Sequence, residues 1–234
     1  MDLAVILAGA GEGRRMGGSG PKLLLEFRGR TLLEHAAAAF LACGAVGEIV
    51  AVVPDALRTA AEARLARLAN PRGARLAVVA GGATRRESVG LGLDALARGL
   101  TWVAVHDVAR AFVPATLVER VLEAARATGA AIPAVPVRDT LKEVVDGRVA
   151  RTLPRENVRG AQTPQVFAHA ILARAHAFAR ERRLEATDDA ALAEAIGAPV
   201  AVVPGDPANL KITEPTDLIV LQALLDAGPG GPRD

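Results

Sequence analysis

Short apolar runs alternate with amphipathic segments along most of the chain, and each run ends at glycine, proline or a polar residue. Continuous apolar runs of this length are typical of strands that are buried on both faces of a sheet. They predict strands at residues 3–8, 48–53, 76–80, 102–106, 131–135 and 200–203. Helical periodicity predicts helices at residues 31–44, 55–69, 84–97, 114–128, 168–183, 188–196 and 215–226.

This strand–helix alternation predicts an α/β fold of the Rossmann-like kind, a mostly parallel sheet with helices on both faces. Sheets of this type bind ligands beyond the carboxyl ends of their strands. The loops of interest are therefore residues 9–22, 81–88 and 106–110, which follow the first, third and fourth predicted strands.

The alternation stops between Pro136 and Gln165, where prolines and glycines separate short pieces with period-two patterning. The pieces 140–145 and 148–153 predict a hairpin that projects from the main sheet. We expect one domain over residues 1–227, an arm over about 137–163 and a disordered tail at 228–234. Because an isolated two-stranded ribbon is marginally stable, the arm is expected to pack on a partner chain in a homodimer.

Composition excludes several classes of function. No apolar stretch reaches the roughly 18 residues of a membrane span, and the first residues lack the pattern of a secretory signal. We therefore expect a cytoplasmic protein without a membrane partner. The net charge of +2, the spread of the cations and an aromatic content of 3% argue against nucleic-acid binding. The single cysteine, Cys43, is interpreted as a small core residue.

The loop after the first predicted strand carries the densest candidate chemistry. Glycines at positions 9, 11 and 13 let backbone N–H groups approach a ligand, and cations follow at Arg14, Arg15 and Lys22. Backbone donors combined with nearby cations predict a binding site for a triphosphate. The chain has only three lysines, and two of them, Lys22 and Lys211, lie in loops where a compact charge can contact phosphate.

Two common nucleotide motifs fail on spacing. A dinucleotide-binding Gly-x-Gly-x-x-Gly loop needs glycine at position 14 or 16, where Arg14 and Met16 stand. A P-loop needs a Gly-Lys pair, and the chain contains none. An NAD-dependent oxidoreductase is therefore disfavoured.

The loop resembles the signature of the sugar-nucleotidyltransferase-like superfamily, here Ala10-Gly-Glu-Gly-Arg-Arg-Met16 followed by Pro21-Lys22. Further blocks, in order along nearly the whole chain, are similar to those of the 2-C-methyl-D-erythritol 4-phosphate cytidylyltransferase family. These blocks are Gly81-Gly82 with Arg85 and Ser88-Val89, His106–Arg110, Pro136–Thr140, Gln162–Gln165, Thr187–Asp189 and Asn209–Thr213.

The resemblance implies transfer of CMP from CTP to a small phosphorylated polyol, with release of pyrophosphate. A phosphate monoester is largely dianionic at neutral pH, so the attacking oxygen needs no general base. Catalysis then depends on alignment and on cations that face the developing charge. The resemblance also implies Mg²⁺ or another divalent cation, bound mainly through the CTP phosphates with no dedicated protein site.

The resemblance assigns residues to three roles. The implied catalytic residues are Arg15, Lys22, Arg155 and Lys211. The implied CTP-binding residues are Ala10, Gly11, Gly13, Gly82, Arg85, Ser88 and Asp107. The implied acceptor-binding residues are Asp107, Arg110, Thr140, Arg155, Thr163 and Lys211.

Taken without the resemblance, His106 is interpreted as a structural residue, and Asp188 and Asp189 as acids at a helix N-terminus. Two positions depart from the family pattern: Ala83 replaces a polar or acidic residue, and Val108 replaces an alanine. Two alternative functions stay open at this point. One is a cytidylyltransferase for another acceptor such as ribitol 5-phosphate, and the other is a non-catalytic nucleotide-binding regulator.

Overall fold

The computed structural model describes residues 1–11, 21–97 and 99–227. Four strands form the parallel half of a central sheet: β1 (Leu3–Ala8), β4 (Val46–Val53), β5 (Arg75–Ala80) and β6 (Trp102–Asp107). β1 lies between β4 and β6, and β5 pairs with the far side of β4. All four strands run in the same direction, so the loops that follow them meet at one edge of the sheet.

The other half of the sheet contains the remaining strands β7 (Ala130–Pro136), β10 (Arg159–Ala161), β11 (Gln165–Ala168) and β12 (Ala201–Pro204). β11 lies antiparallel between β6 and β7, and β12 pairs with β7 in parallel. The sequence patterns had predicted no strand at β10 or β11. Both are short, and they become strands only because β7 and β6 offer unpaired backbone groups beside them.

A bulge separates β10 from β11. Arg159 pairs with Pro136 and Val166 pairs with Ala131, so seven steps along the outer segment correspond to five along β7. The two extra residues are accommodated at Gln162–Pro164, where the peptide bond before Pro164 is cis. Bulges redirect side chains, and this one directs Thr163 toward the end of β6.

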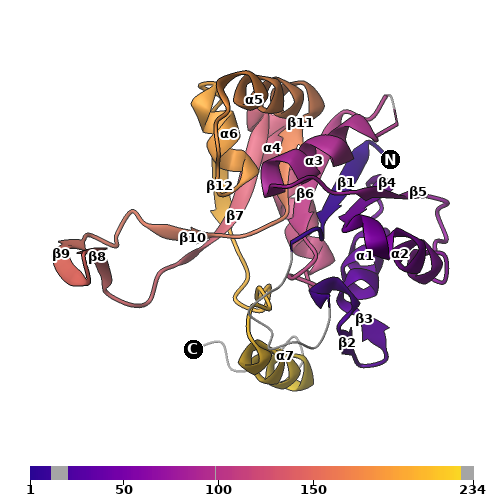
Figure 1. Ribbon diagram of the computed structural model, residues 1–234, viewed down its shortest axis with the longest axis horizontal. Coiled ribbons are helices and arrows are strands. Elements are labelled where there is room, and N and C mark those ends of the chain that lie inside the picture. Colours follow the sequence, from indigo (N-terminus) through magenta and orange to yellow (C-terminus); the bar gives the residue numbers. More distant parts are fainter. Residues whose placement is uncertain (12–20, 98, 228–234) are drawn as a thin grey trace.

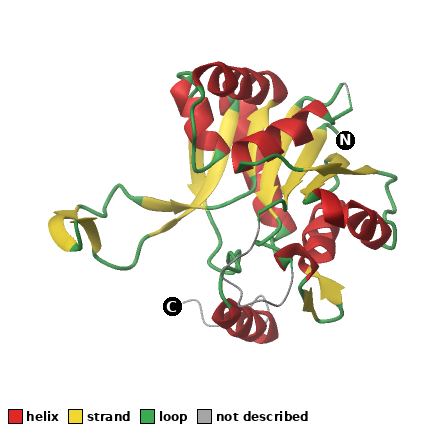
Figure 2. Cartoon of the chain, in the orientation of Figure 1, coloured by secondary structure: helices red, strands yellow, loops and turns green. Residues whose placement is uncertain are grey.

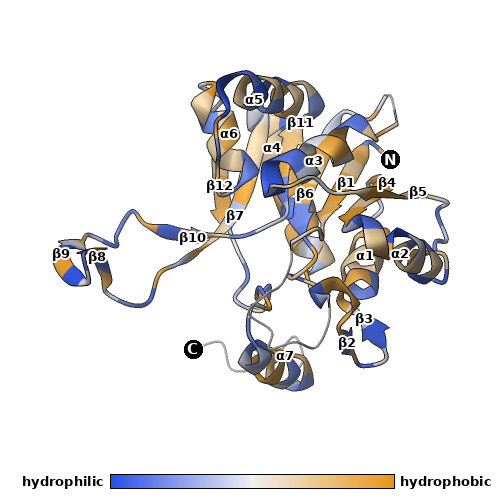
Figure 3. Cartoon of the chain, in the orientation of Figure 1, coloured by the Kyte–Doolittle hydropathy of each residue, from blue (hydrophilic) through white to orange (hydrophobic). Residues whose placement is uncertain are grey.

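Helices cover both faces of the sheet (Figures 1 and 2). Alternate residues of β1 point to opposite faces and join two separate hydrophobic cores. Leu3, Val5 and Leu7 pack with α1 (Leu32–Ala42) and α4 (Ala115–Thr128). On the other face, Ala4 and Ile6 pack with α3 (Arg85–Asp94) and α5 (His169–Arg182). The apolar strands at the centre of the molecule stand out in Figure 3.

The remaining helices lie at the margins of this sandwich. They are α2 (Arg58–Leu65), α6 (Asp189–Ala195), α7 (Pro215–Ala227) and the 3₁₀ helices η2 (Lys22–Leu24) and η3 (Asp55–Leu57). The segment predicted as one helix over 55–69 is therefore divided between η3 and α2. A small hairpin of β2 (Glu26–Phe27) and β3 (Arg30–Thr31) precedes α1. Cys43 is buried beside α1, which confirms its interpretation as a core residue.

The predicted hairpin is present as β8 (Leu141–Val145) paired with β9 (Arg148–Leu153), and it projects away from the sandwich (Figure 1). Its turn is Asp146-Gly147, and both residues have positive φ, 48° and 73°. This is the pattern of a tight hairpin turn. Val144, Val145 and Val149 are more than half exposed on it. Among the described residues, no helix has the length and apolarity that crossing a membrane requires.

Candidate active site

The loops predicted to form the site follow β1, β5 and β6, and backbone hydrogen bonds hold the last two against the ends of neighbouring strands. The amide of Gly81 donates to the carbonyl of Val53 at 2.8 Å, and the amide of Val108 donates to the carbonyl of Ala8 at 3.1 Å. The sheet therefore assembles the site at the carboxyl ends of its parallel strands, as the fold class predicts.

Glycine is required where the loop after β1 meets the loop after β5. A Cβ atom on Gly81 would lie 2.3 Å from the Cβ of Ala10, a distance that real Cβ atoms do not show. The close approach places Ala10 beside Gly81. Gly13 and Arg15, assigned above to CTP binding and catalysis, lie outside the described residues.

The start of α3 is fixed by its own polar side chains. Thr84 and Glu87 form the predicted capping box, and the Glu87 carboxylate also accepts from the amide of Ala83 at 3.0 Å. The Ser88 hydroxyl accepts from the amide of Gly82 at 3.1 Å and donates to the carbonyl of Thr84 at 2.9 Å. Ser88 is buried, so its contribution to a ligand site is to hold the Gly82 loop in place.

Asp107, at the end of β6, is the centre of a charge cluster. Its Oδ2 lies 2.7 Å from Nζ of Lys211, and its Oδ1 lies 3.6 Å from the guanidinium of Arg85. Burial alone would raise the pKa of Asp107, but Lys211 and then Arg85 outweigh burial and hold this pKa below its usual value. Asp107 is therefore an ionised carboxylate with two cationic partners.

Asp217, in the first turn of α7, holds the loop that carries Lys211. Its carboxylate accepts from the amides of Thr213 at 2.6 Å and of Glu214 at 2.8 Å. Burial would raise the pKa of Asp217, but these hydrogen bonds and then the charge of Lys22 lower it.

His106 and Thr163 form a buried pair beneath Asp107. His106 Nε2 lies 3.0 Å from the carbonyl of Arg110, which can only accept, so this nitrogen carries the proton. His106 Nδ1 must then accept from the Thr163 hydroxyl at 3.0 Å, and that hydroxyl accepts from the amide of Asp107 at 3.1 Å. Burial lowers the pKa of His106 to about 4. The residue is neutral and structural, as its sequence position had indicated.

Arg110 and Asn209 bind the loop before α7 to the bulge. An Arg110 guanidinium nitrogen donates to the backbone carbonyl of Asn209 at 2.7 Å. The side-chain amide of Asn209 donates to the backbone carbonyl of Thr163 at 2.8 Å. Burial lowers the pKa of Arg110, and its buried Nε has no partner among the described residues. Arg110 and Thr163, both assigned to the acceptor, therefore also position the loop that carries Lys211.

The arm residues assigned to the site are not part of this cluster within one chain. Thr140 is exposed immediately before β8, and the arm extends away from the sheet edge (Figure 1). Arg155 is exposed, and its guanidinium donates to the carbonyl of Arg138 in the arm itself. One chain alone thus brings together the residues from the loops but not those from the arm.

The sequence does not reveal the ion pair between Arg85 and Asp189, which lies next to Asp107. Asp188 and Asp189 both lie at the N-terminus of α6, as the sequence predicts: Asp188 is the N-cap, whose Oδ1 accepts from the amide of Ala191 at 3.0 Å, and Asp189 is the first residue of the helix. Asp189 is also buried and pairs with Arg85 at 2.7 Å. Neighbouring acids at a helix start give no signal that separates these roles, because the distinction depends on what packs above the helix.

Among the described residues, no group of three or more His, Cys, Asp or Glu side chains is arranged to hold a metal ion. Both oxygens of Asp107 face cations.

Known proteins resemble the chain over nearly its full length. A sequence model of the family described as IspD, 2-C-methyl-D-erythritol 4-phosphate cytidylyltransferase, matches residues 3–227. A protein of that name from Thermus thermophilus is 46% identical over 224 residues, which cover 96% of this chain and 97% of the relative. Another from Carboxydothermus hydrogenoformans is 42% identical over 217 residues, 92% of each chain.

Solved structures agree with these relatives. The crystal structure of 2-C-methyl-D-erythritol 4-phosphate cytidylyltransferase from Thermus thermophilus has a TM-score of 0.78 at 42% identity and covers 97% of this chain and 100% of its own. The 4-diphosphocytidyl-2C-methyl-D-erythritol synthase from Anaerococcus prevotii has a TM-score of 0.83 at 29% identity, covering 96% and 98%. The loops, the charge cluster and these matches together place the chain in the 2-C-methyl-D-erythritol 4-phosphate cytidylyltransferase family.

Proposed function

We propose that the protein transfers CMP from CTP to 2-C-methyl-D-erythritol 4-phosphate, giving 4-diphosphocytidyl-2-C-methyl-D-erythritol and pyrophosphate, a step in isoprenoid precursor synthesis. The observation that carries the proposal is the Asp107 cluster, with Lys211 and Arg85, beside the Gly81–Ser88 loop. A nucleotide and a phosphorylated polyol both need cations at this edge, and the polyol also needs a hydrogen-bond acceptor for its hydroxyls.

In the proposed reaction an oxygen of the acceptor phosphate attacks the α-phosphorus of CTP, and the bond from that phosphorus to the pyrophosphate oxygen breaks. The acceptor phosphate is already largely dianionic at neutral pH, so no residue needs to remove a proton. Arg15 and Lys22 face the α-phosphate and the leaving oxygens, and Lys211 orients the attacking phosphate. Asp107 accepts from the polyol hydroxyls, while Ala10, Gly11, Gly13 and Gly82 surround the nucleotide.

Mg²⁺ belongs to the proposal as a cofactor held mainly by the CTP phosphates. Magnesium is commonly bound by one or two carboxylates together with substrate phosphates. Both oxygens of Asp107 face protein cations, so the proposal leaves most of the ion's coordination to the CTP phosphates. When bound, the ion supplies charge that stabilises the leaving pyrophosphate. A cytoplasmic location is proposed as well, since both substrates are multiply charged and do not pass through a bilayer unaided.

A homodimer is proposed because the exposed apolar side chains of the arm can be buried against a second subunit. β8 and β9 form a two-stranded ribbon with three exposed valines, and such ribbons are rarely stable by themselves. The arm of one subunit lies across its partner in this proposal. Thr140 and Arg155 then reach the partner's acceptor site, which explains why one chain alone does not bring them to Asp107.

The function is tested by measuring pyrophosphate release from CTP and Mg²⁺ with each acceptor offered separately. We expect release with 2-C-methyl-D-erythritol 4-phosphate, and far slower release with ribitol 5-phosphate. Preference for ribitol 5-phosphate would keep the reaction type and change the substrate. Measurable CTP binding without release in either case would contradict the proposal and favour a nucleotide-binding regulator.

A further inference from the structure

Five side chains, in which basic residues alternate with carboxylates, form a row from the interior to the candidate active site: His176, Asp189, Arg85, Asp107 and Lys211. His176 Nε2 lies 2.9 Å from Asp189, Asp189 lies 2.7 Å from Arg85, Arg85 lies 3.6 Å from Asp107, and Asp107 lies 2.7 Å from Lys211. We call this set the charge row. Only its outer residues have a role in the function proposed above.

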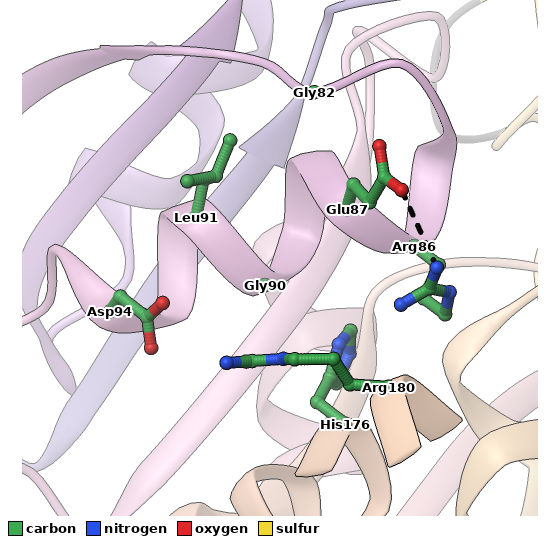
Figure 4. Close-up of a pocket in the computed structure, with 8 residues that line it drawn as sticks. All are labelled: Gly82, Arg86, Glu87, Gly90, Leu91, Asp94, His176 and Arg180. Carbon is green, nitrogen blue, oxygen red and sulfur yellow. Dashed lines mark hydrogen bonds and ion pairs between the residues drawn. The ribbon is translucent and has the colours of Figure 1, made fainter. Parts of the chain in front are cut away.

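The inner end of the charge row is rigidly held. Asp189 and His176 are 1% and 3% exposed. The side-chain carbonyl of Gln165 accepts from the amides of Asp189 at 3.1 Å and of Ala190 at 3.0 Å. His176 rises from α5 toward α3 (Figure 4), where its Nδ1 lies 3.6 Å from the position that a Cβ on Gly90 would occupy. Gln165 thus fixes the backbone of Asp189, and His176 contacts one carboxylate oxygen, so the other oxygen can hold a cation in one orientation.

The outer end is looser. The Lys211 side chain is 45% exposed, against 28% for Arg85 and 13% for Asp107. A lysine is a flexible point charge, whereas an arginine fork loses less freedom for each contact it makes. Arg85 pairs closely with Asp189 and only distantly with Asp107. Burial would lower the pKa of Arg85, but Asp189 and then Asp107 outweigh it and raise this pKa.

This difference in freedom between Lys211 and Arg85 matters when a phosphate dianion enters the site. The dianion attracts the mobile Lys211 away from Asp107, and a buried carboxylate left without a cation is costly. Arg85 cannot follow the phosphate freely because Asp189 holds it. We propose that Asp189, supported by His176, is a positioning residue that anchors Arg85, and that Arg85 keeps Asp107 paired and oriented toward the acceptor polyol while Lys211 binds the acceptor phosphate.

A purely local role for Asp189 does not explain its contacts. The N-cap of α6 is Asp188, whose carboxylate accepts from the amide of Ala191. Asp189 instead turns its two oxygens to residues of α5 and α3, far from it in the sequence. Burying a carboxylate there is justified only if a cation is to be fixed against it.

The inference rests on the proposed function, and the wild-type enzyme must therefore first release pyrophosphate with the acceptor. Steady-state kinetics of Asp189→Asn are then compared with the wild type. We expect the KM for the acceptor to rise about 10-fold, within the range of coupling between contacting charges, and the KM for CTP, to which the resemblance also assigns Arg85, to rise less. Glu194→Gln is the control, because it removes an exposed negative charge from the same helix. It should leave the acceptor KM unchanged.

A double-mutant cycle separates the positioning of Arg85 by Asp189 from a general loss of structure. If Asp189 acts through Arg85, Asp189→Asn has no further effect on the acceptor KM once Arg85→Gln is present. Should Asp189→Asn fail to fold, Arg85→Lys is measured in its place. This variant keeps the positive charge but loses the guanidinium fork that contacts both carboxylates, and the same rise in acceptor KM is expected. Additive effects in the cycle, or a rise in the KM for CTP in its place, would overturn the inference. An inactive wild type would instead refute the proposed function.

Discussion

At the scale of single residues, the site shows how the partners of a buried side chain decide between a chemical and a structural role. His106 and Asp107 are neighbours on β6, yet one is a neutral core residue and the other an ionised carboxylate. The difference lies in their partners: His106 faces a carbonyl and a hydroxyl, whereas Asp107 faces two cations. Residue type alone would have favoured the histidine as the reactive group.

The buried histidine predicts a pH dependence of stability. Burial lowers the pKa of His106 from 6.5 to about 4, so the unfolded chain binds more protons than the folded chain between these values. Stability contributed by the neutral imidazole is therefore full above pH 6.5 and is lost as the pH falls toward 4, by about 3 kcal/mol in all. Urea unfolding between pH 4 and pH 8 measures this loss.

The comparison needs two variants. His106→Gln removes the titrating group, and its unfolding free energy should fall less steeply between pH 6.5 and pH 4 even though it is lower overall. His169→Gln removes an exposed histidine and should retain the slope of the wild type. Equal slopes in the wild type and His106→Gln would show that His106 is not the cause.

At the scale of elements, the first turn of α3 is the part of the proposed nucleotide site that the sequence describes best. Its capping box was visible as Thr84 and Glu87, and the structure shows that the same turn fixes the Gly82 loop through Ser88. A Cβ on Gly82 would lie 2.6 Å from the Cβ of Glu87, so the loop and the cap depend on each other.

Thr84→Ala tests this dependence. Loss of an N-cap hydroxyl costs about 1 kcal/mol, and loosening of the Gly82 loop should also raise the KM for CTP. Thr31→Ala removes the matching capping box of α1 and should lower stability without raising the KM for CTP. The measurements are thermal unfolding and CTP kinetics of both variants. An unchanged KM for CTP in Thr84→Ala would separate the cap from nucleotide binding.

At the scale of the whole molecule, the open question is which chain supplies the arm residues to each site. A shared site predicts complementation between two inactive variants, Lys22→Ala and Arg155→Ala. Random exchange makes half of the dimers mixed, and each mixed dimer has one site with both residues intact. Mixing should therefore restore about one quarter of the wild-type turnover, as expected for a two-fold dimer.

The measurement is pyrophosphate release after the two variants have been denatured together, refolded and diluted. Each variant treated alone is the control, and it should remain inactive. If the mixture also stays inactive while its mass in solution is that of a dimer, each chain uses its own Arg155. A mass equal to one chain would contradict the dimer itself.

The sequence by itself determined most of the framework. Apolar runs and capping boxes located the parallel strands and most helices, because these elements bury continuous apolar surface and their ends are marked by local hydrogen bonds. The glycine-rich loop and the lysines at 22 and 211 were recognisable because backbone access and compact charge are properties of individual residues.

Only the tertiary structure decided which polar residues belong together. β10 and β11 exist because β7 and β6 provide partners for their backbone groups, and the bulge between them aims Thr163 at His106. Asp189 pairs with Arg85, 104 residues away in the sequence. Such contacts depend on long-range packing, and a local pattern of residues carries no information about the partner that the fold will bring beside it.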